Sequence, residues 1–354
     1  MKTYDYDYVI YIGRFEGPHN GHMTTLTKAL RLGQKVIVLL GTANSPRTFK
    51  NPWTETEREF MMRNSMSVAD NARVEFAGIE DRLYQHPEWL VKVRHAVELI
   101  VRNTHDQLTP ETDINDVRFA IIGHDKDESS VYIRDFPEWT VVDVGSHTNG
   151  PNSKPLSSTM IRHLIFTGNM GYIEGNVPSA VYSFMENFVE TEEFKLIKAE
   201  YDHYVEEENV YKELPYWMNF KTADAVVFQS GHVLLVKRGR IPGKGLWALP
   251  GGHVEPTETA YEAAFRELDQ ETKIKVPMGK LQGSVVFEEE FNHPDRSLRC
   301  RVTGIYGRTS TTAFCIALDA TASSGEVTKL PKVKGRDDAV EAKWFPVSDI
   351  NSMR

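Results

Sequence analysis

Apolar runs and amphipathic stretches alternate along the first half of the chain. Short apolar runs at 8–12 and 35–40 predict strands, and the stretch between them, 21–32, has the spacing of a helix. The same pattern predicts further strands at 74–77, 117–122 and 140–144 and helices at 56–69 and 89–103. Strands that alternate with helices form parallel sheets, so we expect an α/β fold with a doubly wound, Rossmann-like sheet.

The pattern changes in the second half. Between 186 and 213 the chain is strongly acidic and aromatic, which suits an exposed, helix-rich connector better than a core. Beyond it, Gly and Pro turns separate short apolar runs, and one marked helix is expected at 258–271. The apolar runs are 225–228, 233–236, 284–287 and 311–318. This pattern predicts a mixed sheet with few helices.

These changes divide the chain. Its 354 residues exceed the usual size of one domain, and we place the boundary near residue 205. We expect a first domain at 1–190, an acidic helical connector at 191–215 and a second domain at 216–354.

The composition is that of a globular protein, with 40% hydrophobic and 26% charged residues. No stretch approaches the roughly 18 unbroken apolar residues of a membrane helix, and the start of the chain lacks the pattern of a secretory signal. We expect a cytoplasmic protein without a membrane partner. Cys300 and Cys315 are too few for a disulfide framework and lack metal-ligand spacing, so free thiols are expected.

The formal net charge of −9 would repel a nucleic-acid backbone, and the chain has no basic run. We therefore expect no nucleic-acid partner. Small phosphorylated ligands remain compatible with this charge, because a few local cations or a helix N-terminus can hold a phosphate.

A loop that can hold phosphate follows the first predicted strand and reads GRFEGPHNGH. Gly13 lets the backbone turn, and Pro18 stiffens the loop. His19 and His22 stand at the mouth of the next predicted helix, where both imidazoles can face a phosphate beside unpaired backbone N–H groups. Such a site would neutralise the pyrophosphate that leaves when the α-phosphate of ATP is attacked. Taken alone, an ordinary pair of surface or core histidines fits the same spacing.

A second phosphate-binding element is predicted downstream, in PLSSTMIRHLIFTG. Ser157 and Thr159 can cap a helix, and Arg162, one turn in, can reach phosphate oxygens as a fork of donors. An ordinary capped helix with a solvated arginine has the same pattern.

The two segments together resemble the nucleotidylyltransferase superfamily, which pairs an HxGH loop with an SxTxxR helix start, here 19–22 and 157–162. Two further segments, RTFKNPWTETER and IIGHDKDESSVYIRDFPEW, resemble the archaeal-type nicotinamide mononucleotide adenylyltransferases, which occur fused to Nudix domains in some bacteria and phages. The resemblance covers about 6–190.

The resemblance implies transfer of AMP from ATP to nicotinamide mononucleotide, with NAD and pyrophosphate as products. His19, His22 and Arg162 would hold the ATP phosphates, with Mg²⁺ bridging. The ATP pocket would further include Gly13, Arg14, Phe15, Ser157 and Thr159.

The segment after the second predicted strand offers residues for the acceptor. Trp53, which follows Asn51 in a loop, can stack on a cationic pyridinium ring, although a buried core tryptophan is the other interpretation. Arg47, Lys50 and Arg58 are candidates for the mononucleotide phosphate, and each also fits a surface charge.

Lys126 and Asp127 are two more candidates for the acceptor. They lie in a loop at the carboxyl end of a predicted strand, where open α/β sheets bind ligands.

A different site is predicted in WALPGGHVEPTETAYEAAFRELDQETKIKVP. Glu267 and Glu271 are one helical turn apart, so both carboxylates can share a hard divalent cation. Mg²⁺ held there would bridge a diphosphate and activate a water, while Arg266 orients a glutamate through a bidentate pair. An exposed acidic helix with internal charge pairs is the alternative.

This stretch resembles the Nudix box, GX5EX7REUXEEXGU, where U is aliphatic. The matching residues are Gly252, Glu258, Arg266, Glu267, Leu268, Glu271 and Ile274. Two positions depart from the pattern: Gln270 replaces a glutamate, which predicts weaker metal binding or fewer bound ions, and Lys273 replaces a glycine, which predicts a local backbone change.

The resemblance extends to Nudix domains that cleave ADP-ribose to AMP and ribose 5-phosphate, through the segment FNHPDRSLRCRVTGIYGRTSTTAFCIAL. Arg296, Arg299 and Arg301 can bind terminal ribose or phosphate groups, or form an exposed basic strand. Candidates for the catalytic base, which the sequence does not rank, are Glu255, Glu288, Asp337 and Asp338.

Three functional hypotheses follow. The first is a bifunctional enzyme that uses ATP as substrate, Mg²⁺ or alternatively Mn²⁺ as metal, and nicotinamide mononucleotide, NAD and ADP-ribose as small-molecule partners. The second, kept open by Gln270, is a transferase whose Nudix domain senses ADP-ribose or NAD without cutting it. The third is a transferase with another acceptor. Trp53, a candidate for stacking on a pyridinium ring, is evidence against this third hypothesis. A homo-oligomer is compatible with all three.

Overall fold

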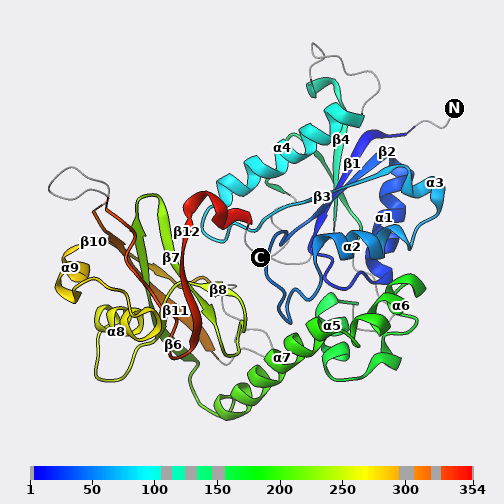
Figure 1. The fold of residues 1–354 in the computed structure, drawn as a ribbon. Coiled ribbons are helices and arrows are strands. Elements are labelled where there is room, and N and C mark those ends of the chain that lie inside the picture. The colour runs from blue at the N-terminus through cyan, green and yellow to red at the C-terminus, as the bar shows by residue number, and fades with distance from the viewer. Residues whose placement is uncertain are drawn as a thin grey trace. The chain divides into compact units, whose positions relative to one another are not determined.

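The structure is a computed structural model, which describes residues 4–104, 114–123, 134–145, 156–294, 307–319 and 328–352. The chain divides into two compact units, Met1–Lys198 and Ala199–Arg354. Figure 1 shows the first in blue to green and the second in green to red.

The first unit contains a sheet of five strands in the order β3-β2-β1-β4-β5, in which every neighbouring pair is parallel. The strands are β1 (Tyr6–Gly13), β2 (Gly33–Leu40), β3 (Val74–Gly78), β4 (Phe119–Gly123) and β5 (Thr140–Asp143). β1 lies at the centre of the sheet, where the strand order reverses, and open α/β sheets bind ligands beyond the carboxyl ends of such strands.

Helices pack on both faces of this sheet (Figure 1). Alternate residues of β1 point to opposite faces, so Ile10 packs in one core cluster with α4 (His86–Thr104) and Val9 in the other with α1 (Asn20–Leu32). Both side chains have 0% of their surface exposed. The predicted doubly wound α/β fold is therefore confirmed.

The prediction of one continuous helix at 56–69 is wrong. The stretch 56–69 forms two helices, α2 (Glu55–Arg63) and the short α3 (Val68–Asn71). Asn64 ends α2, and the hydroxyl of Ser67 accepts a hydrogen bond from the backbone of Asp70 to begin α3. The serine supplies an N-cap in the middle of the amphipathic pattern, and a cap competes with continuation of a helix.

Helices follow the first sheet. They are α5 (Ser158–Phe166), α6 (Ser179–Phe188) and α7 (Glu192–Tyr211), with a 3-10 turn at Met170–Tyr172. The expectation that the acidic stretch is an exposed connector is wrong for one face of α7, where Phe194, Ile197, Tyr201 and Tyr204 are buried. Aromatic residues at helical spacing form this apolar face, while the acidic residues between them lower the average hydropathy of the stretch.

The second unit contains a mixed sheet of seven strands. The order along the main path is β10-β11-β6-β7-β12, in which β11 and β6 are parallel and the other pairs are antiparallel. The strands are β6 (Met218–Gln229), β7 (His232–Arg238), β8 (Trp247–Ala248), β9 (Gly251–His253), β10 (Val285–Phe291), β11 (Gly307–Ala317) and β12 (Ala339–Pro346). The predicted mixed sheet is confirmed.

Helix α8 (Ala260–Thr272) packs on this sheet. Thr259 caps it and forms a capping box with Glu262. Phe265 and Leu268 are buried in one core cluster with Val227 of β6, so the opposite face of the helix carries the polar residues. The unit also contains the short helix α9 (Met278–Gly283) and a terminal 3-10 turn.

Two smaller expectations concern cysteines and membranes. Cys315 is a free thiol on β11, and Cys300 lies outside the described residues. Within the part of the chain that the structure describes, no helix combines the length and apolarity needed to cross a membrane.

Candidate active sites

The phosphate loop leaves β1 through a tight turn. A Cβ added to Gly13 would lie 2.8 Å from the ring of Phe15, so any side chain here would displace that buried ring. Phe15 has a φ of 51°, in the left-handed region, and its ring is buried between Tyr11 and His22, at 4.9 and 5.1 Å. Aromatic packing therefore holds the strained residue in place and orients one of the predicted catalytic imidazoles.

His19 and His22 lie face to face at the start of α1. Their rings are stacked with 3.7 Å between centroids, and His19 is the N-cap residue of the helix. The backbone N–H of His19 donates a hydrogen bond to Nδ1 of His22 at 3.3 Å. Since Nδ1 accepts, the proton of a neutral His22 resides on Nε2, which makes that atom a hydrogen-bond donor suited to a phosphate oxygen.

Helix α5, which carries the second motif, is docked on this loop. Ser157 is its N-cap, and its hydroxyl accepts from the backbone of the third residue of the helix. Ser158 donates a hydrogen bond to the carbonyl of Gly17 at 3.2 Å. Nη1 of Arg162 donates to the carbonyl of Glu16 at 2.8 Å, and Nη2 to Thr159 at 3.2 Å. The structure thus joins two motifs that lie far apart in the sequence.

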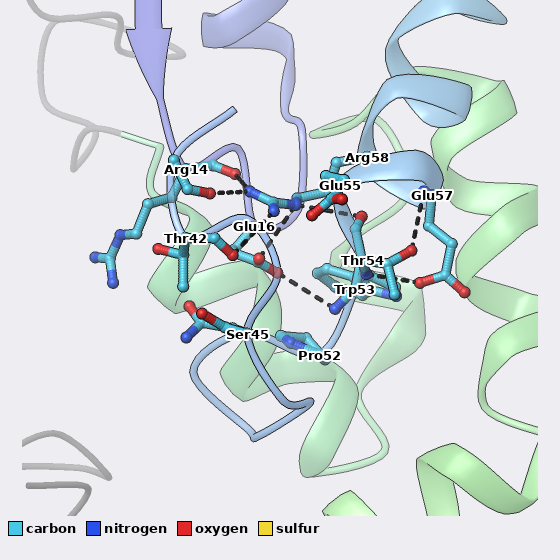
Figure 2. A network of polar contacts seen from close by, with 12 residues as sticks. Arg14, Glu16, Thr42, Ser45, Pro52, Trp53, Thr54, Glu55, Glu57 and Arg58 are labelled. Carbon is cyan, nitrogen blue, oxygen red and sulfur yellow. Dashed lines mark hydrogen bonds and ion pairs between the residues drawn. The ribbon is translucent and has the colours of Figure 1, made fainter. Parts of the chain in front are cut away.

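Glu16 is a residue of this site that the sequence analysis missed. It is only 1% exposed, and Figure 2 shows its carboxylate between Arg58 and the backbone of Trp53. Its Oε1 is 3.2 Å from Nε of Arg58. Burial raises the pKa of Glu16 to about 7, although nearby arginines act to lower it. A single acidic residue inside a loop predicted to bind a polyanion was the signal available in the sequence.

The acceptor candidates Arg47 and Arg58 are both engaged by the protein. Arg47 forms a bidentate pair with Glu57, at 2.6 and 2.8 Å, and donates to the carbonyl of Pro52. Arg58 is completely buried, and its guanidinium faces backbone carbonyls and Glu16. The guanidinium of Arg58 is enclosed by the protein, so Arg58 is no longer a candidate for the acceptor phosphate, whereas Arg47 is 27% exposed and stays one.

Trp53 and Asn51 lie in the loop before α2. Trp53 is 2% exposed and packs 5.8 Å from the ring of Phe188, which fits the core interpretation better than an open stacking face. Its Nε1 and the Oδ1 of Asn51 are buried without a hydrogen-bond partner among the described residues. Lys126 and Asp127 lie outside the described residues, whereas Lys50 is described and buried.

The second site begins at the turn between β8 and β9. A Cβ on Gly252 would lie 2.3 Å from Oε1 of Glu267, so the absence of a side chain there makes room for that carboxylate. The backbone N–H of Gly251 donates to Oε2 of Glu271 at 3.0 Å. Two adjacent glycines of β9 therefore lie against the carboxylates of Glu267 and Glu271.

Arg266 organises the acidic residues around it. Its guanidinium pairs with Glu258 through two hydrogen bonds of 2.6 and 3.0 Å, and Nη1 reaches Glu267 at 2.7 Å and Gln270 at 3.2 Å. The pairing with Arg266 lowers the pKa of Glu258 to about 2. The sequence analysis was wrong to place Glu258 on the helix: it precedes the cap Thr259, and only this turn lets it reach back to Arg266.

Glu267 and Glu271 fit a hard divalent cation by their chemistry, since both offer carboxylate oxygens from successive turns of α8. Burial raises the pKa of Glu271 to about 7, and Glu267 adds to the effect. A cation bound between them would relieve this repulsion. No group of three or more histidine, cysteine or acidic side chains with metal-binding geometry occurs in the described ranges, and Gln270 stands where a third carboxylate would.

Lys273, the second departure, ends α8 with φ 45° and ψ 38°. This left-handed conformation is the one that glycine adopts most easily, so the expected local backbone effect takes the form of a strained C-cap. Arg296, Arg299 and Arg301 lie outside the described residues. Among the base candidates, Asp338 is ion-paired with Arg240 at 3.0 Å, and Glu255, Glu288 and Asp337 are exposed.

Family models of known proteins match both parts of the chain. A cytidylyltransferase-like domain model matches residues 10–164, and a NUDIX domain model matches residues 218–354. A nicotinamide/nicotinic acid mononucleotide adenylyltransferase from Acinetobacter baylyi is 32% identical over 198 residues, which span 56% of this chain and 95% of that protein. The chain belongs to the nicotinamide mononucleotide adenylyltransferase family.

This adenylyltransferase family member carries a Nudix domain as its second part. An ADP-ribose pyrophosphatase from Methanocaldococcus jannaschii is 33% identical over 127 residues, which span 36% of this chain and 62% of that protein. A bifunctional NMN adenylyltransferase/ADP ribose pyrophosphatase from Francisella tularensis, solved with AMP and a manganese ion, has a TM-score of 0.81 and 29% identity, covering 98% of this chain and 95% of its own. The family resemblance found in the sequence is confirmed.

Proposed function

We propose that this chain is a bifunctional enzyme of NAD metabolism. Its first activity transfers AMP from ATP to nicotinamide mononucleotide and releases pyrophosphate. Its second hydrolyses ADP-ribose, or a related nucleoside diphosphate derivative, to AMP and ribose 5-phosphate. The observation that carries the proposal is the full-length similarity to the Francisella protein. The domains proposed are 1–190 and 216–354, joined by 191–215.

Adenylyl transfer requires the charge of the departing pyrophosphate to be neutralised. His19, His22 and Arg162 are proposed for this task. The contacts of Ser158 and Arg162 with the loop that carries the histidines support the proposal. ATP would bind as its magnesium complex, in which the cation would supply part of the charge neutralisation at the phosphates. The pocket around the nucleotide is proposed to include Gly13, Arg14, Phe15, Ser157 and Thr159.

The acceptor is proposed to bind beside this pocket. Asn51 and Trp53 remain candidates because each has a buried polar atom without a partner among the described residues, and Arg47, Lys126 and Asp127 remain candidates from the sequence. A buried polar atom that lacks a partner costs free energy, so a ligand that supplies one is favoured there.

Hydrolysis of ADP-ribose is proposed at the Nudix box. Glu267 and Glu271 would hold Mg²⁺ or Mn²⁺, which supplies charge neutralisation at the diphosphate and an activated water when bound. Arg266 orients Glu267 and ties it to Glu258. The neutral Gln270 is expected to reduce the affinity for the cation rather than to abolish binding.

A Nudix domain that only senses ADP-ribose is the second candidate, and it is not favoured. Both carboxylates of the proposed metal site are present, and the similar proteins named above are enzymes. Calorimetry that detected tight ADP-ribose binding, together with no AMP released in Mg²⁺ or Mn²⁺, would reverse this preference.

The direct test is product formation by the full chain. With nicotinamide mononucleotide, ATP and Mg²⁺ it should form NAD and pyrophosphate, and with ADP-ribose and Mg²⁺ or Mn²⁺ it should release AMP. Absence of NAD removes the first activity, and absence of AMP removes the second.

Substitution of a proposed catalytic imidazole sharpens this test. His22→Ala should lower NAD formation on the order of 10²-fold or more, as expected when a preorganised charge-stabilising donor is lost, and leave AMP release unchanged. His95→Ala, on the exposed side of α4, is the matched control and should behave as wild type. Wild-type NAD formation by His22→Ala contradicts its assigned role.

A further inference from the structure

Arg58 lies at the centre of the polar network behind the phosphate loop (Figure 2). The sequence pattern made it a candidate ligand for the phosphate of the acceptor, yet 0% of its side chain is exposed. Its guanidinium faces backbone carbonyls and the carboxylate of Glu16. The environment of Arg58 therefore calls for a different role.

Four backbone carbonyls receive the donors of this guanidinium. Nη1 donates to the carbonyl of Arg14 and, at 2.7 Å, to that of Gly41. Nη2 donates to Thr42 at 3.5 Å, and Nε to Thr54 at 3.3 Å. Arg14 follows β1 directly, whereas Gly41 and Thr42 follow β2. One side chain thus ties together the loops that leave two neighbouring parallel strands.

Glu16 connects Arg58 to the two segments that are proposed to bind the two substrates. Its Oε2 accepts a hydrogen bond from the backbone of Trp53 at 3.4 Å, in the loop proposed for the acceptor. Its backbone carbonyl accepts from Arg162 at 2.8 Å, in the helix proposed for the ATP phosphates. Its Oε1 is 3.2 Å from Nε of Arg58. A displacement of Arg58 would therefore be passed on to both loops through direct contacts.

We propose that Arg58 is a positioning residue for adenylyl transfer, which together with Glu16 fixes the ATP loop against the acceptor loop. The inference rests on the proposed function of the first unit. Transfer between two bound substrates needs their reacting atoms in one geometry, and a misplacement of about 1 Å can cost on the order of 10²-fold in rate. A planar guanidinium can bridge several carbonyls at fixed angles, whereas the compact ammonium of a lysine cannot.

The negative charge of Glu16 is the counter-charge of Arg58 in this network. Burial raises its pKa to about 7, so the carboxyl changes from mostly protonated to mostly ionised between about pH 6 and pH 8. When it is protonated, Arg58 loses a counter-charge, and one of the oxygens that face N–H donors carries a hydrogen. The other charged groups that act on the pair are Arg14, Glu55, Asp81 and Arg162.

Arg58→Lys, studied by steady-state kinetics of NAD formation in the full chain, tests the inference. We expect kcat/KM to fall on the order of 10²-fold, with KM raised for ATP as well as for nicotinamide mononucleotide. AMP release from ADP-ribose should stay unchanged. Arg63→Lys is the matched control: Arg63 lies on the same helix, is 31% exposed, and contacts Glu59, Asn71 and the carbonyl of Val74 but no residue of the proposed substrate loops. Its replacement should change each constant by less than about twofold.

The outcomes separate the two roles of Arg58. A raised KM for nicotinamide mononucleotide alone, with unchanged constants for ATP, would make Arg58 a phosphate ligand and overturn the inference. Wild-type constants for both substrates would overturn it as well. If the wild-type chain itself forms no NAD, the proposed function fails, which is a distinct result and removes the inference with it.

Glu16→Gln provides a second measurement that does not depend on the folding of Arg58→Lys. The amide keeps the shape of the side chain and removes its charge. The ratio of wild-type to Glu16→Gln transfer rates should fall about tenfold between pH 8 and pH 6, because wild type loses the ionised carboxyl and the variant has none to lose. Titration of the substrates is common to both proteins and cancels in this ratio. A constant ratio across the range would overturn the inference.

Discussion

The two units each contain an arginine–glutamate pair in a nucleotide site, and the pairs behave in opposite ways. In the first unit, Glu16 and Arg58 are 3.2 Å apart with side chains 1% and 0% exposed. In the second, Glu258 and Arg266 are 2.6 Å apart with side chains 13% and 25% exposed. The pKa of Glu16 is raised to about 7, whereas that of Glu258 is lowered to about 2.

The difference shows that an ion pair does not by itself determine the charge state of its carboxyl. Two hydrogen bonds from Arg266 stabilise the ionised form of Glu258, which keeps contact with water. Glu16 has no such contact with water. The free-energy cost of burying its charge exceeds the favourable Coulomb interaction with Arg58, which acts over a longer distance. Glu258 therefore keeps its negative charge near neutral pH, whereas Glu16 gains or loses its charge there.

The largest effect should come from the two carboxylates of α8 that are proposed to hold a divalent cation, Glu267 and Glu271. Glu271→Gln should lower AMP release from ADP-ribose by on the order of 10³-fold, because loss of the proposed metal ligand would remove several kcal/mol of charge stabilisation. NAD formation should remain at the wild-type rate in the same preparation. Asp269→Asn, on the same helix and half-exposed, is the matched control. Equal losses of both activities would show damage to the whole chain instead.

The same substitution in the two pairs should change stability in opposite directions. Because the folded state raises the pKa of Glu16 from 4.5 to about 7, wild type loses stability as the pH rises through this window. Glu16→Gln lacks that loss and should be more stable than wild type above pH 7, by at most about 3 kcal/mol. Calorimetry of the full chain from pH 5 to pH 8 measures the difference. A difference that does not change with pH would contradict the raised pKa.

For Glu258 the sign reverses. Its lowered pKa contributes stability that is present above pH 4.5 and is lost as the pH falls toward about 2. Glu258→Gln should therefore destabilise the second unit near neutral pH, and this difference should shrink in acid. A stabilised variant at pH 7 would show that the two pairs do not differ in the way described.

The smallest effect concerns the end of the Nudix helix. Lys273 has a left-handed conformation, which is strained for a residue with a Cβ, so Lys273→Gly should stabilise the chain by about 1 kcal/mol in urea unfolding. Lys273→Ala is the control, because it removes the ion pair with Asp269 but keeps the Cβ and its strain. Equal effects of the two substitutions would assign the change to the ion pair.

Local spacing in the sequence determined the two families and most of the elements. The HxGH loop after an apolar strand, the capped helix that starts at Ser158 and the acidic helix α8 are each set by residues within a few turns of one another. Helix periodicity, strand alternation and caps act over such short distances, so their physics can be recognised without coordinates. The same holds for the paired carboxylates Glu267 and Glu271.

Only the tertiary structure decided what the charged residues do. Whether an arginine binds a ligand or holds two loops of the protein together depends on the groups that surround it. The carbonyls around Arg58 belong to segments that meet only when β1 and β2 pair. The pKa of Glu16 likewise depends on its burial and its arginine neighbours, not on its place in the motif. Desolvation and Coulomb interactions act through space, so the chemistry of these side chains became visible only once the chain was folded.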